Sequence, residues 1–369
     1  MVIKGRINMS RPTRMYCDTN ALLHNVLRVK QCAPHQKIMA VVKANAYGCG
    51  IANIVPFLDG YVDALGVACI EEALAIRRLG VNLSCVLLQG VFSAEELLIA
   101  AGAGFQCVIH QRQQLEWLLT NRLTEQVHIW IKVNTGMHRL GFLPDEVAGV
   151  VDAVSTCPWV AKEIGIMTHF ARADEVGCTG NISQFELFNK LDLSGYQLTR
   201  SLANSAAVLS MTNTHADVVR PGIMLYGISP FIGQTGQSLG LKPVMQFLSA
   251  LSAVHHYPPN SSVGYGGTWS SPRASVIGVI PVGYADGYPR HIRPGTPVWV
   301  NQMIVPIVGR VSMDMLTVDL TACSNPQVGD PVELWGQHLP VEVIAESAGT
   351  IAYELLTKIT PRVRERGAG

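Results

Sequence analysis

The sequence has no marked excess of either charge. Its 369 residues include 28 Lys and Arg against 27 Asp and Glu, which gives a formal net charge of +1. This balance argues against a nucleic-acid partner and favours a small polar metabolite. Charged residues are also scarce, at 15%, whereas hydrophobic residues make up 48%. Such a composition is typical of a chain with a large core and favours a buried subunit interface.

Long hydrophobic runs and paired cysteines are absent as well. No apolar run approaches the ~18 residues of a membrane span, and residues 1–13 lack the apolar stretch of a signal peptide. The nine cysteines show no paired spacing, and their odd number leaves at least one thiol unpartnered. The histidines lack the spacing of metal ligands. We therefore expect a cytoplasmic protein with free thiols, no membrane partner and no bound metal.

The first two thirds of the chain alternate between apolar runs and segments with helical spacing. The eight apolar runs are 38–42, 64–68, 85–88, 107–109, 127–133, 164–168, 198–203 and 218–225. Between them, segments such as 70–79 and 144–155 place apolar residues three and four apart. The pattern predicts an α/β fold, with parallel strands and right-handed crossovers that close into a (β/α)8 barrel. An open doubly wound sheet is the alternative, but no G-x-G-x-x-G follows the first strand.

After about residue 240 the pattern changes to β-rich segments separated by turn residues. These segments are 244–254, 274–282, 297–300, 304–310, 316–320 and 331–334. They predict a C-terminal, mainly-β domain. Residues 343–359 place Ile344, Ala348, Ile351 and Leu355 on one face and predict a helix. We therefore expect a barrel over residues 14–245 and a β domain over residues 246–369.

Polar residues follow the apolar runs where the predicted strands end. In a closed barrel these ends meet at one rim, which is where catalytic residues of such folds lie. Lys43 follows the first strand, and such a lysine is either solvated or an amine that condenses with an aldehyde. The later strand ends supply phosphate donors, two guanidinium groups and an imidazole. They are Arg139, His169, Asn204, Ser205, Arg220 and the backbone N–H groups of Gly222 and Ile223.

Eight separated blocks of the sequence resemble those of bacterial alanine racemases. They are AVVKANAYG (40–48), TGMHRLGF (135–142), THFARADE (168–175), RPGIMLYG (220–227), VGYGGTW (263–269), GYADGYPR (283–290), GRVSMDM (309–315) and AYELLTKITPRV (352–363). Their order and spacing agree from about residue 14 to residue 363. The resemblance implies a pyridoxal-phosphate enzyme that interconverts L- and D-alanine for cell-wall metabolism. It also implies a barrel followed by a β domain, and a homodimer whose active sites combine residues of both subunits.

The resemblance gives most of the matched residues a role toward the cofactor. It implies that Lys43 carries the cofactor and that Arg220 faces its ring nitrogen. A guanidinium stays protonated, so Arg220 donates to that nitrogen without protonating it, which favours quick return of the proton to Cα. The resemblance places Arg139 near the ring hydroxyl and His169 next to Arg220. The remaining cofactor-binding residues, most of them on the phosphate, are Tyr47, Asn204, Ser205, Gly222, Ile223 and Tyr353.

Racemisation requires a proton carrier on each face of the substrate Cα. Lys43 serves one face, and the resemblance assigns the other to Tyr265, contributed by the β domain of the second subunit. A phenol titrates near ~10, so we expect positive charge from His169 and Arg220 to stabilise its anion. Without the resemblance, Tyr265 would pass as a tyrosine of a glycine-rich turn.

The resemblance also implies the residues that bind substrate. The backbone N–H of Met313, with Asp314 beside it, is expected to reach across the dimer to the substrate carboxylate, and Arg139 assists. Without the family, these two residues would pass as an ordinary β-turn. Tyr353, Tyr265 and Met313 would narrow the entrance to little more than a methyl side chain. Lys132 matches a position that is often carbamylated in this family, which would orient Arg139, although a lysine beside a strand is usually only solvated.

One departure and three alternatives remain open. Cys49 stands where the family commonly has histidine and leaves a thiol near the cofactor. A broad-specificity amino-acid racemase of the same fold would share nearly every residue. A fold-type III decarboxylase would carry a catalytic cysteine element, which the context of Cys323 does not resemble. A non-catalytic pyridoxal-phosphate carrier would lack the β domain.

Overall fold

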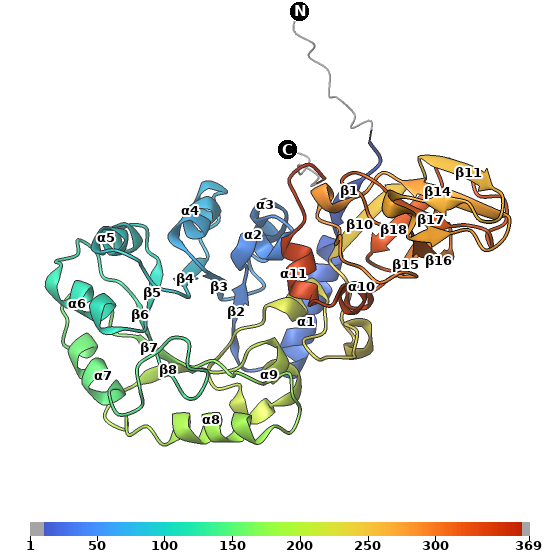
Figure 1. Cartoon of the computed structure of the whole chain (residues 1–369). Coiled ribbons are helices and arrows are strands. Elements are labelled where there is room, and N and C mark those ends of the chain that lie inside the picture. The colour runs from blue at the N-terminus through green and yellow to red at the C-terminus, as the bar shows by residue number, and fades with distance from the viewer. Residues whose placement is uncertain (1–10, 364–369) are drawn as a thin grey trace, which may run out of the picture. The chain divides into compact units, whose positions relative to one another are not determined.

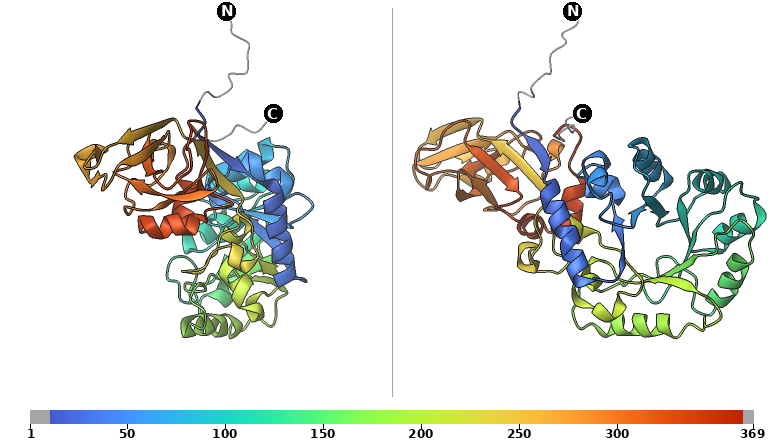
Figure 2. Two further views of the ribbon diagram at one scale, coloured as in Figure 1. Left: turned by 90° about the vertical axis from the view of Figure 1, so that its right-hand side faces the viewer. Right: turned by 180° about the vertical axis from the view of Figure 1, so that it is seen from behind.

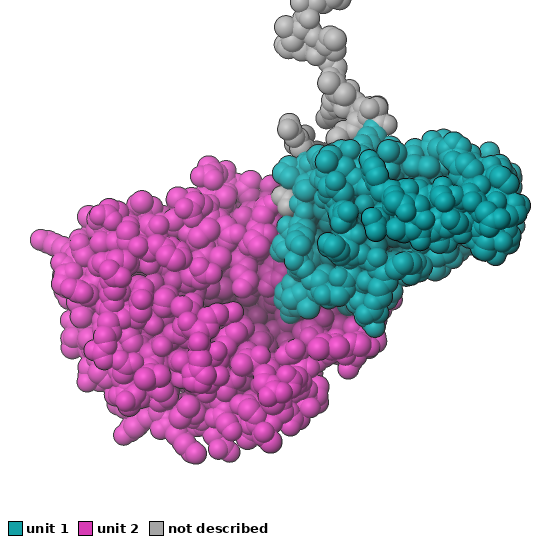
Figure 3. Space-filling model, viewed as in Figure 1, with its two compact units in different colours: residues 1–18, 242–369 teal, residues 19–241 magenta. Residues whose placement is uncertain are grey.

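The computed structural model describes residues 11–363, which belong to two compact units (Figure 3). One unit is Thr19–Leu241, and the other combines Met1–Asp18 with Lys242–Gly369. Of residues 1–13, where we expect no signal peptide, residues 1–10 lie outside the described part of the chain. Each unit is built around its own eight-stranded sheet.

The unit Thr19–Leu241 is a parallel (β/α)8 barrel, as the sequence predicts (Figures 1 and 2). Its strands, in spatial order, are β9 (Val218–Val219), β2 (Lys37–Val41), β3 (Ala64–Val67), β4 (Ser84–Leu87), β5 (Gln106–Ile109), β6 (Ile129–Lys132), β7 (Ile164–Met167) and β8 (Leu198–Ser201). Backbone hydrogen bonds close the ring between β8 and β9, from Asp217 N to Arg200 O (3.1 Å) and from Arg220 N to Ala203 O (2.8 Å).

Helices alternate with the strands along the chain and lie outside the ring (Figure 2). They are α1 (Thr19–Cys32), α2 (Lys43–Tyr47), α3 (Ile51–Ile54), α4 (Ile70–Arg78), α5 (Ala94–Gly102), α6 (Arg112–Thr120), α7 (Val147–Ser155), α8 (Thr179–Asn189) and α9 (Ser205–Ser210). Helix α7 shows why these segments are helical: its valines recur at three- and four-residue intervals, and Val147, Val150, Val151 and Val154 are buried.

The barrel interior is packed with large side chains from alternate positions of the strands. One buried cluster consists of Met39, Val86, Val108, Trp130, Met167 and Val218. The ring of Trp130 occupies the space beside Gly165, where an added Cβ would lie 2.2 Å from its Cε3. The indole N–H of Trp130 also donates to Gln106 Oε1 at 2.6 Å, so the ring is fixed in this position. Only glycine fits at residue 165.

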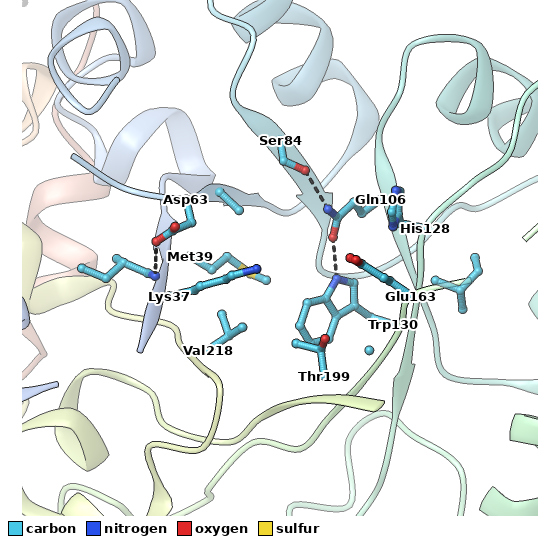
Figure 4. Close-up of a pocket in the computed structure, with 14 residues that line it drawn as sticks. Lys37, Met39, Asp63, Ser84, Gln106, His128, Trp130, Glu163, Thr199 and Val218 are labelled. Carbon is cyan, nitrogen blue, oxygen red and sulfur yellow. Dashed lines mark hydrogen bonds between the residues drawn. The ribbon is translucent and has the colours of Figure 1, made fainter. Parts of the chain in front are cut away.

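A hollow of about 250 Å³ lies at the amino ends of the barrel strands (Figure 4). Lys37, Asp63, His128 and Glu163 line it, and Gln106 Nε2 donates across it to Ser84 Oγ at 2.7 Å. Lys37 is the first residue of β2, whereas Lys43 follows the last residue of that strand. The hollow is therefore at the opposite end of the barrel from the residues that the sequence singles out.

The second unit contains a mainly antiparallel β structure, also as predicted. Its sheet has the order β1 (Arg14–Cys17), β10 (Met245–Ala250), β18 (Pro331–Trp335), β15 (Pro297–Val300), β16 (Met303–Val308), β17 (Leu316–Asp319), β14 (Ser275–Ile280) and β11 (Ala253–Tyr257). A separate pair is formed by β12 (Ser262–Val263) and β13 (Trp269–Ser270). Strand β1 pairs with β10, although the expected domain boundaries assigned residues 14–17 to the barrel.

The predicted helix over residues 343–359 is two helices. Helix α10 (Val341–Ala348) ends at Gly349, whose φ of 66° is left-handed and easily adopted by glycine. Helix α11 (Ala352–Thr357) starts afresh after Ile351, which is exposed. The sequence predicts one helix because the regular spacing of apolar residues continues past Gly349, where helix α10 ends.

The fit of Trp130 against Gly165 predicts that Gly165→Ala destabilises the protein. Because a hydrogen bond fixes the indole, the added methyl group forces a backbone shift that costs about 1–3 kcal/mol. Urea unfolding measures the change in free energy. The matched control is Gly149→Ala in α7, where nothing lies within 4 Å of the added Cβ; it should be neutral or stabilising by about 0.5–1 kcal/mol. Equal stabilities for the two variants would show that the ring moves freely.

Candidate active site

Lys43 lies at the carboxyl end of β2, at the start of an unusual turn. Residues 44–47 all have positive φ angles between 51° and 54°. This left-handed conformation costs a non-glycine residue about 1–2 kcal/mol, so surrounding contacts must impose it. Backbone hydrogen bonds support the turn, from Ala46 N to Val42 O at 2.9 Å and from Gly48 N to Ala44 O at 3.0 Å. The carboxylate of Glu72 also contributes by accepting from Asn45 N at 3.2 Å. The side chain of Asn45 in turn accepts from Ile51 N at 2.9 Å.

Four of the expected phosphate ligands lie together at the adjacent strand ends. Ser205 Oγ accepts from the backbone N–H of Gly222 at 2.8 Å. Gly222 also packs against Tyr47, because an added Cβ would lie 2.4 Å from the Tyr47 hydroxyl oxygen. Ile223 directly follows Gly222 and starts a 3-10 turn. Asn204 caps α9 by accepting from Ala207 N at 3.1 Å, so it orients the helix that begins with Ser205.

Arg220 is buried and held only by neutral groups among the contacts that the structure describes. Its guanidinium donates to Ser201 Oγ at 2.5 Å, to Leu202 O at 3.1 Å and to Thr168 O. Thr168 is itself fixed by a 2.7 Å hydrogen bond between its hydroxyl and that of Thr135. A buried guanidinium without a carboxylate is costly, so this site is suited to an added acceptor or anion.

The expected cofactor residues form a cluster of positive charge at the barrel rim. Burial first, and then Arg139, lower the pKa of Lys43. Burial lowers the pKa of Lys132 to about 7, and the charges of Arg220, Arg139 and Lys43 add to this effect. Between residues 11 and 363, none of these four cations lies within ion-pair distance of a carboxylate. The rim therefore carries charge that attracts anions.

His169 and Arg220 respond differently to the same surroundings. Burial and the neighbouring cations, Arg220 foremost, hold the pKa of His169 well below its ordinary value. His169 is therefore neutral at neutral pH. Burial lowers the pKa of Arg220 only to about 10, so its guanidinium stays charged there. Glu72 opposes the trend, because its carboxylate raises the pKa of Lys43.

The remaining expected site residues belong to the other unit. Tyr265 begins a 3-10 turn between Gly264 and Gly266, both with positive φ, and is 73% exposed. Met313 is 53% exposed, and Asp314 Oδ1 accepts from Arg362 at 2.8 Å. Tyr353 lies on α11. The roles of these residues toward the barrel cluster remain predictions.

Several residues that shape the rim were not anticipated from the sequence. Glu72, Ser201, Thr168 and Gln184 hold the expected residues or their backbone, and Gln184 Nε2 donates to His169 O at 3.1 Å. The Thr168 hydroxyl accounts for part of the THFARADE block. Two of these residues could have been found by their positions in the sequence. Ser201 is the polar last residue of a barrel strand, and Glu72 is an acidic residue in the first turn of a barrel helix.

Two further expectations concern metals and membranes. Among residues 11–363, no group of three or more His, Cys, Asp or Glu side chains is arranged to hold a metal ion. No helix in the same range is both long and apolar enough to cross a bilayer. Cys49 is buried beside the left-handed turn.

Comparison with known proteins places both units in one family. The alanine racemase N-terminal domain matches residues 17–230, and the alanine racemase C-terminal domain matches residues 244–366. An alanine racemase of Legionella pneumophila (strain Lens) is 56% identical over 356 residues, covering 96% of this chain and 99% of the relative. One from Shewanella sediminis is 48% identical over 352 residues, covering 95% and 97%.

Solved structures agree with this assignment. The biosynthetic alanine racemase of Pseudomonas aeruginosa superposes with a TM-score of 0.91 at 43% identity, covering 96% of this chain and 99% of that one. The alanine racemase of Acinetobacter baumannii has the same TM-score and coverage at 40% identity. Because the family's domains match well over half of the chain and the relatives span nearly all of it, this chain belongs to the alanine racemase family.

Proposed function

We propose that this protein interconverts L- and D-alanine with pyridoxal phosphate as its cofactor. The observation that carries the proposal is the cluster of Lys43, Lys132, Arg139 and Arg220, whose members have no carboxylate at ion-pair distance among the described residues. A phosphate group, a ring oxygen and a substrate carboxylate supply the missing negative charge. The family membership supports the same substrate and cofactor.

The residues at the rim fit pyridoxal phosphate. The Ser205 hydroxyl, the Tyr47 hydroxyl and the backbone at Gly222 and Ile223 would hold the phosphate, since they converge next to the start of a helical turn. Arg220 would donate to the ring nitrogen without transferring its proton, because a pKa of about 10 keeps it charged at neutral pH. Tyr353 and Asn204 would complete the cofactor site, and Arg139 would meet the ring hydroxyl. When bound, the cofactor withdraws electrons and so weakens the Cα–H bond of the attached amino acid.

Two residues would move the proton. Lys43 would act on one face of the substrate Cα, and its lowered pKa makes its amine a better base at neutral pH. Tyr265 of a second subunit would act on the opposite face, because a single base returns the proton to the side from which it came. Arg220 would stabilise the Tyr265 phenolate by its charge, whereas the lowered pKa of His169 leaves that ring to act as a neutral hydrogen-bonding partner.

The proposal requires a homodimer with composite active sites. Tyr265 and Met313 are 73% and 53% exposed in the single chain, and a second subunit would cover these apolar side chains. Met313, Asp314 and Arg139 would bind the substrate carboxylate, while Tyr353 would limit the space for the side chain. Each active site would thus combine the barrel Thr19–Leu241 of one subunit with the β domain of the other. The proposed place is the cytoplasm, and the proposed role is in D-alanine metabolism for the cell wall.

Lys132 would carry a carbamate. With a pKa of about 7, its amine is largely neutral above that pH, and only the neutral amine attacks carbon dioxide. An N–C bond forms, a proton is lost to water, and the product is an anion beside Arg139. Such an anion would offset part of the positive charge of the cluster and orient the Arg139 guanidinium.

The first prediction concerns the activity and its substrate. Purified protein supplied with pyridoxal phosphate is expected to racemise alanine faster than serine, lysine or arginine, as measured by chiral chromatography. Lys43→Ala is expected to lose the absorbance band of lysine-bound cofactor and to lower the rate by ~10³ or more. The control is Lys37→Ala, at the other end of the same strand, which should keep both. Faster racemisation of serine or a basic amino acid would favour the broad-specificity racemase. Release of carbon dioxide from an amino acid would favour the decarboxylase.

The second prediction separates the two bases. In heavy water, Tyr265→Phe should still exchange the Cα hydrogen of the enantiomer that Lys43 serves, with retention of configuration, while exchange of the other enantiomer falls by ~10²–10⁴. The kcat/KM values for the two directions must fall by the same factor, because their ratio equals the equilibrium constant, which is one. Isotope incorporation is therefore the informative readout. Tyr257→Phe, in the exposed strand β11 of the same unit, is the control. Equal losses of exchange for both enantiomers would contradict the two-base proposal.

The third prediction concerns Lys132. Protein incubated with ¹³C-bicarbonate is expected to give a carbamate carbon signal by NMR that grows as the pH rises through about 7 and is absent from Lys132→Arg. The signal should grow with rising pH because the Lys132 amine is protonated and unreactive below its pKa. Lys37→Arg should retain the signal. An identical signal in the wild type and in Lys132→Arg would place the carbamate elsewhere.

A further inference from the structure

The GYADGYPR block has a buried carboxylate at its centre that the proposed mechanism does not use. Asp286 ends the 3-10 turn Tyr284–Asp286 and is 0% exposed. A carboxylate without water needs charged or N–H partners. Arg11 donates to both of its oxygens, at 2.7 and 2.6 Å, and the backbone N–H of Gly283 donates to Oδ2 at 2.9 Å. Arg362 Nε lies 3.1 Å from Oδ1.

The two arginines extend this network to the loop that contains Met313. Arg362 also donates from Nη2 to Asp314 Oδ1 at 2.8 Å, so one guanidinium joins Asp286 to the residue beside Met313. Arg11 donates from Nη2 to Pro281 O at 2.6 Å and reaches the loop at Asp314 O, at 3.5 Å. Three segments that are far apart in the sequence therefore meet at one buried carboxylate, and the arginines join a fourth, at Asp314, to them. Removal of the carboxylate would leave two guanidinium groups without their shared partner.

Backbone contacts place the Asp286 turn directly on the Met313 loop. Tyr284 N donates to Ser312 O at 3.1 Å, and Ala285 N donates to Met313 O at 3.0 Å. At Gly283 a side chain is excluded, because an added Cβ would lie 2.2 Å from Met313 O. The turn and the loop thus pack as one body.

The loop offers two adjacent backbone donors. Its other amides are satisfied within the loop, from Ser312 N to Met315 O at 2.9 Å and from Met315 N to Ser312 Oγ at 3.1 Å. Across residues 11–363, the N–H groups of Met313 and Asp314 donate no hydrogen bond that the structure describes. Neighbouring N–H groups of this kind form a site for an anionic oxygen pair such as a carboxylate.

We propose that Asp286 is the positioning residue of the substrate-carboxylate site: through Arg362 and the backbone of its own turn, it fixes the Met313 and Asp314 N–H groups in a binding geometry. This inference rests on the proposed function, in which the Met313 loop meets the substrate carboxylate. Asp286 itself touches neither substrate nor cofactor, and its effect is transmitted through the loop. The unassigned GYADGYPR block thereby acquires a role in substrate binding.

Two variants test the inference in the full-length enzyme. Asp286→Asn removes the shared charge, and Arg362→Gln breaks the link to Asp314 while leaving the Asp286–Arg11 pair, which guards against a variant that fails to fold. Arg112→Gln is the matched control, because it breaks the exposed Arg112–Glu146 ion pair on the barrel. Hydrogen–deuterium exchange, followed by mass spectrometry without substrate, reports on the loop through peptides covering residues 309–316. Kinetics with alanine report on its binding.

Both variants are expected to show faster exchange in residues 309–316. The KM for alanine should rise about tenfold, which corresponds to the loss of roughly one charge-assisted hydrogen bond, whereas kcat should change much less. Exchange in α5 should match the wild type in both variants. The control Arg112→Gln should match the wild type in the exchange of residues 309–316 and in the KM for alanine. Unchanged exchange together with unchanged KM, or a fall in kcat at constant KM, would overturn the inference. A wild-type protein that does not racemise alanine would refute the proposed function instead, and the exchange measurement would still decide whether Asp286 fixes the loop.

Discussion

The chemistry at the barrel rim depends on one electrostatic constraint: several cations are held close together without carboxylate partners. Burial and mutual repulsion oppose this arrangement, and the lowered pKa values of Lys43 and Lys132 express that opposition. The strand ends overcome it by holding Arg220 with hydroxyl and carbonyl oxygens, which fix the guanidinium without neutralising it. The barrel rim thus keeps positive charge without carboxylate partners, which suits the anionic cofactor and amino-acid substrate proposed above.

Much of the fold could be predicted because burial leaves a periodic pattern in the sequence. Most of the barrel strands are rich in buried apolar residues and stand out between helical segments, whereas β8 (Leu198–Ser201) is largely polar. Strand β1 could not be predicted, since its four residues alternate weakly in burial and its partner β10 lies more than 200 residues away. The two helices α10 and α11 were merged because apolar spacing continues across Gly349, although that glycine is itself a helix-end signal.

The candidate site divides along the same line. Positions such as Lys43, Ser205 and Arg220 could be predicted because polar residues at the ends of apolar strands are conspicuous, yet their individual roles came from the family resemblance. Glu72 lies outside the resembling blocks, and Asp286 lies inside one of them, GYADGYPR, without an assigned role. Neither could be singled out, because the contacts that distinguish them join segments distant in the sequence. Periodicity and spacing in a sequence do not reveal a carboxylate whose role depends on partners far away along the chain.

The left-handed turn after Lys43 has a consequence for how the protein matures. Its residues, two alanines among them, have no local preference for this conformation, so the nascent segment does not adopt it by itself. One of the contacts that support it, from the Glu72 carboxylate to Asn45 N, comes from the following βα unit. We therefore expect the Lys43 amine to reach its final orientation together with the following βα unit, so that the segment after the lysine matures with its neighbour rather than alone.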